Sequence, residues 1–347
     1  MEKRTNYIDI AKGIAIILVV YGHAAAQMKG TPFYEEYLQI PNKIIFSFVM
    51  PIFFMISGSF QRKRLESPNF NHKTYLTKIS SSILLPFYSL SVVFLLINLS
   101  LSNLINAPTL EEMIFSLLLQ QSNGELLPSG VLWFLFTLFS FSIITYFWVK
   151  FLKINLLFLI ILSIFLRSDF NILSHSYYFA FDKISKFFIY YILGYGFHNV
   201  ILKNPIYKFQ YLSIILISYT FLLLISSDGY HQITILSPII NVINPIGPYG
   251  ILGSLIVIGV SFNISKKIKG NVIGKIITYY GKNSILVYVF HMPTFTIFKK
   301  IALYMNVEHS YTKQFILFIP GIVLPLVYGK LIAYNKILYK TLLGRNP

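Results

Sequence analysis

The sequence predicts an all-α, polytopic membrane protein with about ten transmembrane helices and both termini in the cytosol. Of its 347 residues, 55% are apolar and only 12% are charged, whereas a soluble domain carries about a quarter charged residues. Long apolar runs recur from end to end of the chain. Several of them exceed the roughly 20 residues that cross the hydrocarbon core of a bilayer.

The apolar runs also set the positions of the predicted spans. The fifth span is short and could be a re-entrant segment instead. We expect a single domain over residues 1–347, with no soluble domain appended. In chain order the predicted spans are 8–28, 44–60, 80–101, 130–149, 154–167, 184–200, 208–226, 248–264, 283–298 and 314–333.

The net charge of +17 raises the question of nucleic-acid binding, and the placement of the charges answers it. Most of the 29 basic residues fall in segments that share the side of the N-terminus, and most of the 12 acidic residues fall on the other side. Segments 102–129 and 227–247 contain no Lys or Arg. This distribution follows the positive-inside rule, so the basic charge sets the topology and does not indicate nucleic acid as a partner.

The chain contains no cysteine, which excludes disulfides, thiolate metal sites and a cysteinyl acyl intermediate. Its Lys- and Ile-rich composition suits a bacterial inner membrane. The N-terminal run could also be read as a signal peptide, with "MEKR" as its charged region and "AAAQ" as its cleavage site. We favour a retained first span, because cleavage would remove its three ionisable residues.

Those three residues, Asp9, Lys12 and His23, lie inside the first predicted span, "IDIAKGIAIILVVYGHAAAQ". At roughly 100° per residue they share one stripe of a helix, and His23 lies about 16 Å along the axis from Lys12. Ionisable residues in a span face the bundle interior and often mark a functional site. The alternatives are an Asp9–Lys12 surface ion pair, a Lys12 side chain that reaches the interface, and a His23 that only bonds a neighbouring helix.

Two further spans carry candidate residues. The second ends with Arg62, Lys63 and Arg64, a cluster that is either a topology signal or a socket for phosphate groups. The ninth, "GKNSILVYVFHMP", places His291 in mid-membrane, either as a packing hydrogen bond or in a polar cavity. No HExxH, GxSxG or P-loop motif is present, so we expect no bound metal.

The opening "IDIAKGIAIILVVYGH" resembles the signature of the acyltransferase type 3 family of integral-membrane O-acyltransferases, in which a basic residue and a His are separated by ten residues. Lys12 stands where many members have Arg. The resemblance extends over nearly the whole chain and is closest to fucose 4-O-acetylase-like members. The further matching segments are "MPIFFMISGSFQRKR", "LWFLFTLF", "YYILGYGF" and "GKNSILVYVFHMP".

The resemblance implies transfer of an acetyl group from cytosolic acetyl-CoA, a co-substrate, to a hydroxyl of a cell-envelope glycan or other sugar. His23 would be the general base or a transient acyl carrier. The pKa of a free imidazole suits the role of general base. Asp9 would hold Lys12 in position. Coenzyme phosphates would bind Lys12, Arg62, Lys63 and Arg64, and the acceptor would contact Trp133, Tyr288 and His291.

The competing prediction is a transporter or flippase of a glycan precursor or another small polar substrate, with the same polar stripe serving as its path. Such a protein often has inverted repeats and paired broken helices in matching halves. The sequence contains neither pattern, which favours the acyltransferase.

Overall fold

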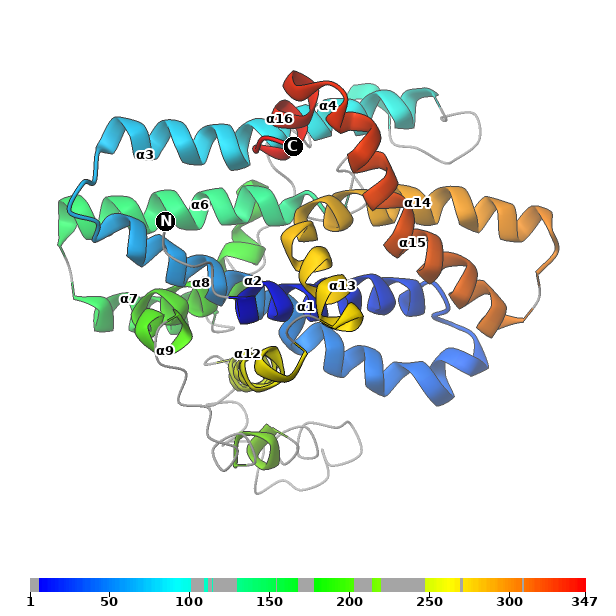
Figure 1. The fold of residues 1–347 in the computed structure, drawn as a ribbon, viewed down its shortest axis with the longest axis horizontal. Helices are drawn as coiled ribbons and strands as arrows, with labels where there is room; N and C mark the ends of the chain where they lie inside the picture. The colour runs from blue at the N-terminus through cyan, green and yellow to red at the C-terminus, as the bar shows by residue number, and fades with distance from the viewer. Residues whose placement is uncertain are drawn as a thin grey trace. The chain divides into compact units, whose positions relative to one another are not determined.

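The computed structural model describes a helical protein (Figure 1). It describes residues 6–100, 109–111, 114, 130–153, 155–167, 178–202, 214–219, 247–268, 271–307 and 309–347. Within these residues every regular element is a helix, and seven helices are long and apolar enough to cross a membrane. The predicted class, an all-α polytopic membrane protein, is confirmed. The seven are Asn6–Ala26, Tyr34–Leu65, His72–Ile97, Trp133–Leu152, Pro248–Ser265, Ser284–Tyr304 and Ser310–Ala333.

Three of the ten predicted spans have no counterpart among these seven. Residues 154–167 correspond to α7 (Leu156–Arg167), which has 12 residues, and residues 184–200 correspond mainly to α8 (Phe181–Gly196), which has 16. Of the predicted span 208–226, only 214–219 lies within the described residues. The number ten and the cytosolic side of the termini stay predictions.

The chain forms two compact units. The first comprises Met1–Lys63 and Ile189–Val323, and the second comprises Arg64–Phe188 and Leu324–Pro347. The boundaries fall within α2 (Gln39–Leu65), α8 and α15 (Ser310–Ala333). The other helices of the first unit are α1 (Asn6–Ala26), α9 (His198–Leu202), α12 (Pro248–Lys267), α13 (Val272–Lys282) and α14 (Ser284–Tyr304). Those of the second are α3 (His72–Ile79), α4 (Leu85–Ser100), α6 (Trp133–Phe147), α7 and α16 (Lys336–Leu343).

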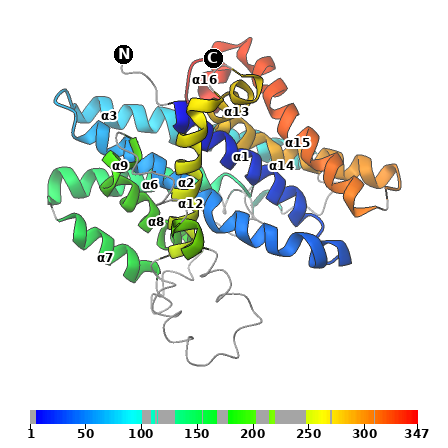
Figure 2. The same cartoon turned by 60° about the horizontal axis from the view of Figure 1, so that its bottom comes forward.

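Helix α1 is the buried centre of the first unit. It contacts α13, α12 and α14, which Figure 2 shows around it. Ile10, Ala15, Ile16 and Val20 on α1 are fully buried. The apolar composition of α1 accounts for this burial, and Ile14, Ile17 and Leu18 on its remaining face are half-buried.

Two glycines allow α13 to lie directly on the backbone of α1. A Cβ atom at Gly13 would collide with the carbonyl oxygen of Ile277, and a Cβ at Gly281 would collide with the carbonyl oxygen of Asp9. Small residues at a helix interface permit this close approach inside a membrane. The contact fixes α13 over the turn of α1 that carries Asp9 and Lys12.

Short π-helical turns occur just before two prolines. The π-turn Tyr34–Leu38 precedes Pro41, and the π-turn Ser80–Leu84 leads into α4, which contains Pro86. Proline donates no backbone hydrogen bond and crowds the preceding turn, and a wider turn relieves that crowding. A third π-turn, Trp148–Leu152, ends its helix at Lys153, whose φ is 51°.

The second unit is held by an aromatic cluster between α3 and α6. The rings of Tyr75 and Tyr146 stack with centroids 5.0 Å apart. The Tyr146 hydroxyl bonds His72 Nδ1 at 2.7 Å, and the Tyr75 hydroxyl donates to the Ser142 carbonyl at 3.1 Å. Each buried hydroxyl therefore has a partner, as burial of a polar group requires.

Candidate active site

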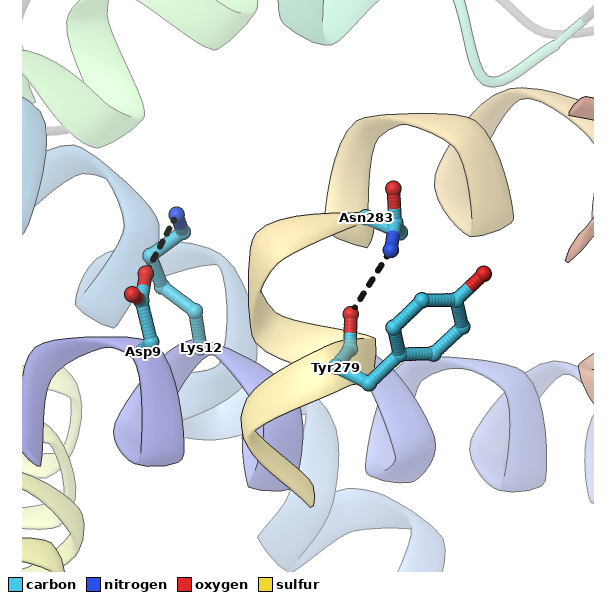
Figure 3. A network of polar contacts seen from close by, with 4 residues as sticks. All are labelled: Asp9, Lys12, Tyr279 and Asn283. Atoms are coloured by element: carbon cyan, nitrogen blue, oxygen red, sulfur yellow. Dashed lines mark hydrogen bonds and ion pairs between the residues drawn. The ribbon is translucent and has the colours of Figure 1, made fainter. Parts of the chain in front are cut away.

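Asp9 and Lys12 form an ion pair near the start of α1. Lys12 Nζ lies 3.5 Å from Asp9 Oδ1, and the two side chains are 22% and 3% exposed (Figure 3). The ion pair considered from the sequence is therefore present. It is not a surface pair, because the carboxylate is buried. A buried carboxylate requires such compensation, so Asp9 holds the ammonium of Lys12 at this turn.

A cavity of about 250 Å³ lies beside this turn of α1, between α1, α13 and the end of α12. Lys275 and Lys282 of α13 line it together with Asn6, Ile10 and Tyr279. The side chain of Asn271 accepts from the backbone of Gly274 at 2.7 Å and so sets the start of α13. Figure 3 shows the other end of α13, where Asn283 Nδ2 donates to the Tyr279 carbonyl at 3.0 Å.

From the sequence, Lys275 and Lys282 are predicted only to mark topology, as two of the basic residues on the side of the N-terminus. Their spacing of seven residues places them on one face of a helix, within about 20° of each other. That signal was available in the sequence. The glycine contact of α13 with α1, which brings this face beside Asn6 and Ile10, was not.

His23 and His291 lie side by side in the first unit. Their ring centroids are 5.2 Å apart, and each packs edge-on against a phenylalanine: His23 on Phe46 at 5.1 Å and His291 on Phe295 at 5.6 Å. His291 is fully buried, whereas His23 is partly exposed. Two candidate residues from the first and ninth predicted spans thus meet in one place.

The backbone fixes the tautomer of neutral His291. Its Nδ1 lies 2.7 Å from the Tyr288 carbonyl and 3.2 Å from the Val287 carbonyl. A carbonyl only accepts, so Nδ1 carries the proton and Nε2 carries the lone pair. Within the described residues, the buried Nε2 has no hydrogen-bond partner. A buried acceptor in this state is suited to a donor from a bound molecule.

Asn42 is a polar residue near the pair that the sequence analysis did not single out. A Cβ atom at Gly22, next to His23, would lie 3.0 Å from Asn42 Oδ1 and 3.2 Å from the Phe46 ring. Asn42 is 2% exposed; its Nδ2 donates to the Tyr34 hydroxyl at 3.3 Å, and Oδ1 has no partner within the described residues. The prediction missed it because the span was started at residue 44, whereas α2 begins at Gln39.

The three basic residues at the end of α2 differ in their contacts and exposure. Arg62 donates to the Gly196 carbonyl at 3.0 Å, and its guanidinium lies 5.6 Å from the centre of the Tyr195 ring. Lys63 and Arg64 are exposed. Arg62 therefore joins α2 to the end of α8, a structural role beside the predicted phosphate contact.

We expect Arg62→Gln to lower the stability of the protein. A hydrogen bond to a charged group contributes about 1.5–3 kcal/mol, and this variant removes it together with the cation–π contact. Thermal unfolding of the detergent-solubilised protein measures the effect. Lys63→Gln, next to it and exposed, should leave the unfolding midpoint unchanged. An equal midpoint for wild type and Arg62→Gln would contradict the structural role.

The two remaining candidate substrate contacts belong to different units. Tyr288 is 5% exposed, and its ring centroid lies 6.0 Å from that of His291, so it belongs to the histidine site. Trp133 belongs to the second unit, where it stacks on Phe187 with centroids 5.5 Å apart and has Lys183 Nζ 5.6 Å from its ring centre. Within the described residues, no group of three or more His, Asp or Glu side chains could hold a metal ion.

Apolar helices long enough to span a membrane, of which α1 carries a partly buried ion pair and α1 and α14 carry two adjacent histidines, define an integral membrane protein with polar groups in its spanning segments. Residues 5–334 match the model of the acyltransferase domain family Acyl_transf_3, so the chain belongs to this family and is a membrane acyltransferase. No curated protein and no solved structure matches the chain.

Proposed function

We propose that this acyltransferase moves an acetyl group from cytosolic acetyl-CoA to a hydroxyl of a cell-envelope glycan in the bacterial cytoplasmic membrane. The observation that carries the proposal is the arrangement along α1. A cavity lined by Asn6, Ile10 and two lysines of α13 lies at the end of α1 that carries Lys12, and His23 lies beside His291 nearer the other end. The fucose 4-O-acetylase-like subgroup, inferred from sequence resemblance, favours a sugar acceptor.

The coenzyme would lie with its phosphates at the Lys12 end of α1. Lys275 and Lys282 supply two ammonium groups to the cavity there, and Lys12, Arg62, Lys63 and Arg64 are further candidate contacts. Coenzyme A is an extended molecule with the thioester at the end opposite its phosphates. Since Lys12 and His23 are separated by about 16 Å of helix, the bound arm could deliver the acetyl group toward His23.

At His23 the acceptor hydroxyl attacks the thioester carbonyl carbon. A C–O bond forms, the C–S bond breaks, and neutral His23 takes the hydroxyl proton. The imidazolium then returns this proton to the departing sulfur, which leaves as free thiol. The partly exposed edge of His23 is open to the reactants, while Phe46 packs against its ring. In the second route open to His23, the imidazole itself carries the acetyl group between the two substrates.

His291 would position the acceptor. Its unpartnered Nε2 can accept from a second hydroxyl of the same sugar, and its Nδ1–H bond to Tyr288 keeps that lone pair directed inward. Asn42 Oδ1 is a second buried acceptor near His23. Holding two reactants in attack geometry can contribute several kcal/mol to the rate.

The proposed function is tested by reconstituting the protein in liposomes with radiolabelled acetyl-CoA and isolated cell-envelope glycan. We expect label in the glycan as base-labile acetyl ester and free coenzyme A in equal amount. Release of coenzyme A without labelled glycan, or no consumption of acetyl-CoA, would contradict the transfer.

The double variant Lys275→Gln/Lys282→Gln should weaken acetyl-CoA binding by about tenfold or more, because each charged contact is worth about 1.5–3 kcal/mol and 1.4 kcal/mol is tenfold. Isothermal titration calorimetry with acetyl-CoA measures this directly. Lys267→Gln is the control, since Lys267 is an exposed lysine at the end of α12 that does not line the cavity.

Equal affinity of the double variant and wild type would show that the coenzyme phosphates bind elsewhere. Repeating the titration with acetyl-dephospho-CoA tells which phosphate is recognised. If the cavity holds the 3′-phosphate, the variants and wild type should bind this analogue equally.

A further inference from the structure

We propose that a second cavity, at the His23 end of α1, binds the anionic group of an acidic glycan acceptor, a phosphate or a carboxylate. The cavity has a volume of about 130 Å³, and its polar lining consists of Gln27, Thr31, Lys299, Ser310 and Lys313. This inference rests on the proposed function, because it names the class of acceptor that the same enzyme would modify.

The cavity lies beyond the histidine pair along α1, on the side away from Lys12. Gln27 follows His23 by four residues, which is about 6 Å along the chain axis and on the same face. Ala302, which also lines the cavity, follows His291 by eleven residues and lies within about 20° of it on α14. The cavity is therefore on the opposite side of the reaction centre from the Lys12 end, where the coenzyme is proposed to bind.

The charge of the cavity selects for an anion. Lys299 and Lys313 come from two helices, α14 and α15, and line the same small space. Among the described residues, neither of these ammonium groups is paired with a carboxylate. The nearby Glu35 accepts instead from Gln39 Nε2 at 2.7 Å. Two uncompensated cations in one cavity favour a negatively charged ligand over a neutral one.

The neutral groups and the volume limit the size of that ligand. The hydroxyl of Thr31 already donates to the Met28 carbonyl at 2.7 Å and accepts from the Tyr34 backbone, so it shapes the loop. Gln27 and Ser310 remain to add hydrogen bonds. A volume of about 130 Å³ corresponds to roughly four water molecules at liquid density. That space suits a phosphate or carboxylate with part of its sugar.

Topology does not account for these lysines. On the predicted orientation, Lys29, Lys299, Lys300 and Lys313 all lie on the extracytoplasmic side, where the positive-inside rule predicts few basic residues. Two of them, Lys299 and Lys313, line one cavity, and recognition of an anion explains the position of these two.

The test compares two matched oligosaccharides, one of galacturonate and one of galactose, binding to the purified protein without acetyl-CoA. We expect the acidic probe to bind more tightly to wild type. Lys299→Gln/Lys313→Gln should weaken the acidic probe by about tenfold and leave the neutral one unchanged. Lys299→Arg/Lys313→Arg should retain the preference because it keeps the charge. Lys300→Gln, a neighbouring lysine outside the lining, is the control.

Equal binding of the two probes to wild type, or no loss in the double glutamine variant, would overturn the proposal. Binding of phosphatidylglycerol in nanodiscs, without tighter binding of the acidic oligosaccharide, would also overturn it. That result would assign the cavity to a lipid headgroup. Because no acetyl-CoA is present, binding of the oligosaccharide is measured independently of acetyl transfer. Failure of acetyl transfer to any acceptor would overturn the proposed function even where the acidic probe binds.

Discussion

His23→Ala should reduce acetyl transfer by about 10²–10⁴-fold, the usual contribution of a positioned general base. The reason is that His23 is the partly exposed member of the histidine pair and accepts the proton of the attacking hydroxyl. Acetyl-CoA binding should be retained, because the coenzyme contacts proposed here lie at the other end of α1. Initial rates of label transfer and calorimetric titration with acetyl-CoA measure the two quantities.

His309→Ala is the matched control, because His309 is exposed and lies in the segment that joins α14 to α15. It should transfer acetyl at the wild-type rate. Transfer by His23→Ala at the wild-type rate would show that His23 takes no part in the reaction. A transport function would then explain the polar stripe of α1 better. Acetyl label that stays on the wild-type protein without acceptor, and is absent from His23→Ala, would select the acetyl-histidine route over direct transfer.

Gly281→Ala should destabilise the protein although it places a better helix former in α13. The exchange of glycine for alanine favours a helix by about 1 kcal/mol. Against this, the added methyl group would collide with the backbone carbonyl of Asp9, which cannot move away as a side chain could. Overpacking costs about 1–3 kcal/mol, so with a cost at the upper end of that range the net effect should be a loss of about 2 kcal/mol.

The same change should weaken acetyl-CoA binding, because it displaces the turn of α1 that carries Lys12 from the face of α13 that carries Lys282. Thermal unfolding and titration with acetyl-CoA measure both effects. Ile276→Ala, on the exposed side of α13, should leave both unchanged. A variant Gly281→Ala as stable as wild type would contradict the close packing of α13 on α1.

Much of the fold follows from the distribution of apolar residues. The first span was predicted at 8–28 and the last at 314–333, close to α1 and α15. Helix α13 is different: residues 272–282 lie between the predicted spans 248–264 and 283–298, so the sequence predicts only a connecting segment there. Its glycine contact with α1 depends on a partner at the far end of the sequence, and local patterns do not identify such a partner.

The candidate site was predictable residue by residue but not as an arrangement. Helical periodicity placed His23 on an interior stripe, and hydropathy placed His291 in mid-membrane. Neither pattern states which helices are neighbours, so the pairing of the two rings emerged only from the structure. Asn42 was missed because an isolated asparagine next to Pro41 is typical of a loop, whereas α2 here begins before it.

The central place of α1 has a consequence for how the protein is assembled in the cell. Helix α1 leaves the ribosome before α12, α13 and α14, the helices that contact it, which are made only after residue 247. At about 5–20 residues per second, this interval is on the order of tens of seconds. During that time Asp9 and Lys12 lack their final surroundings, and a charged residue in lipid costs about 2.5–3.5 kcal/mol. Because Asp9 and Lys12 belong to the same helix, their ion pair can form before the later helices exist and limits this cost in the meantime.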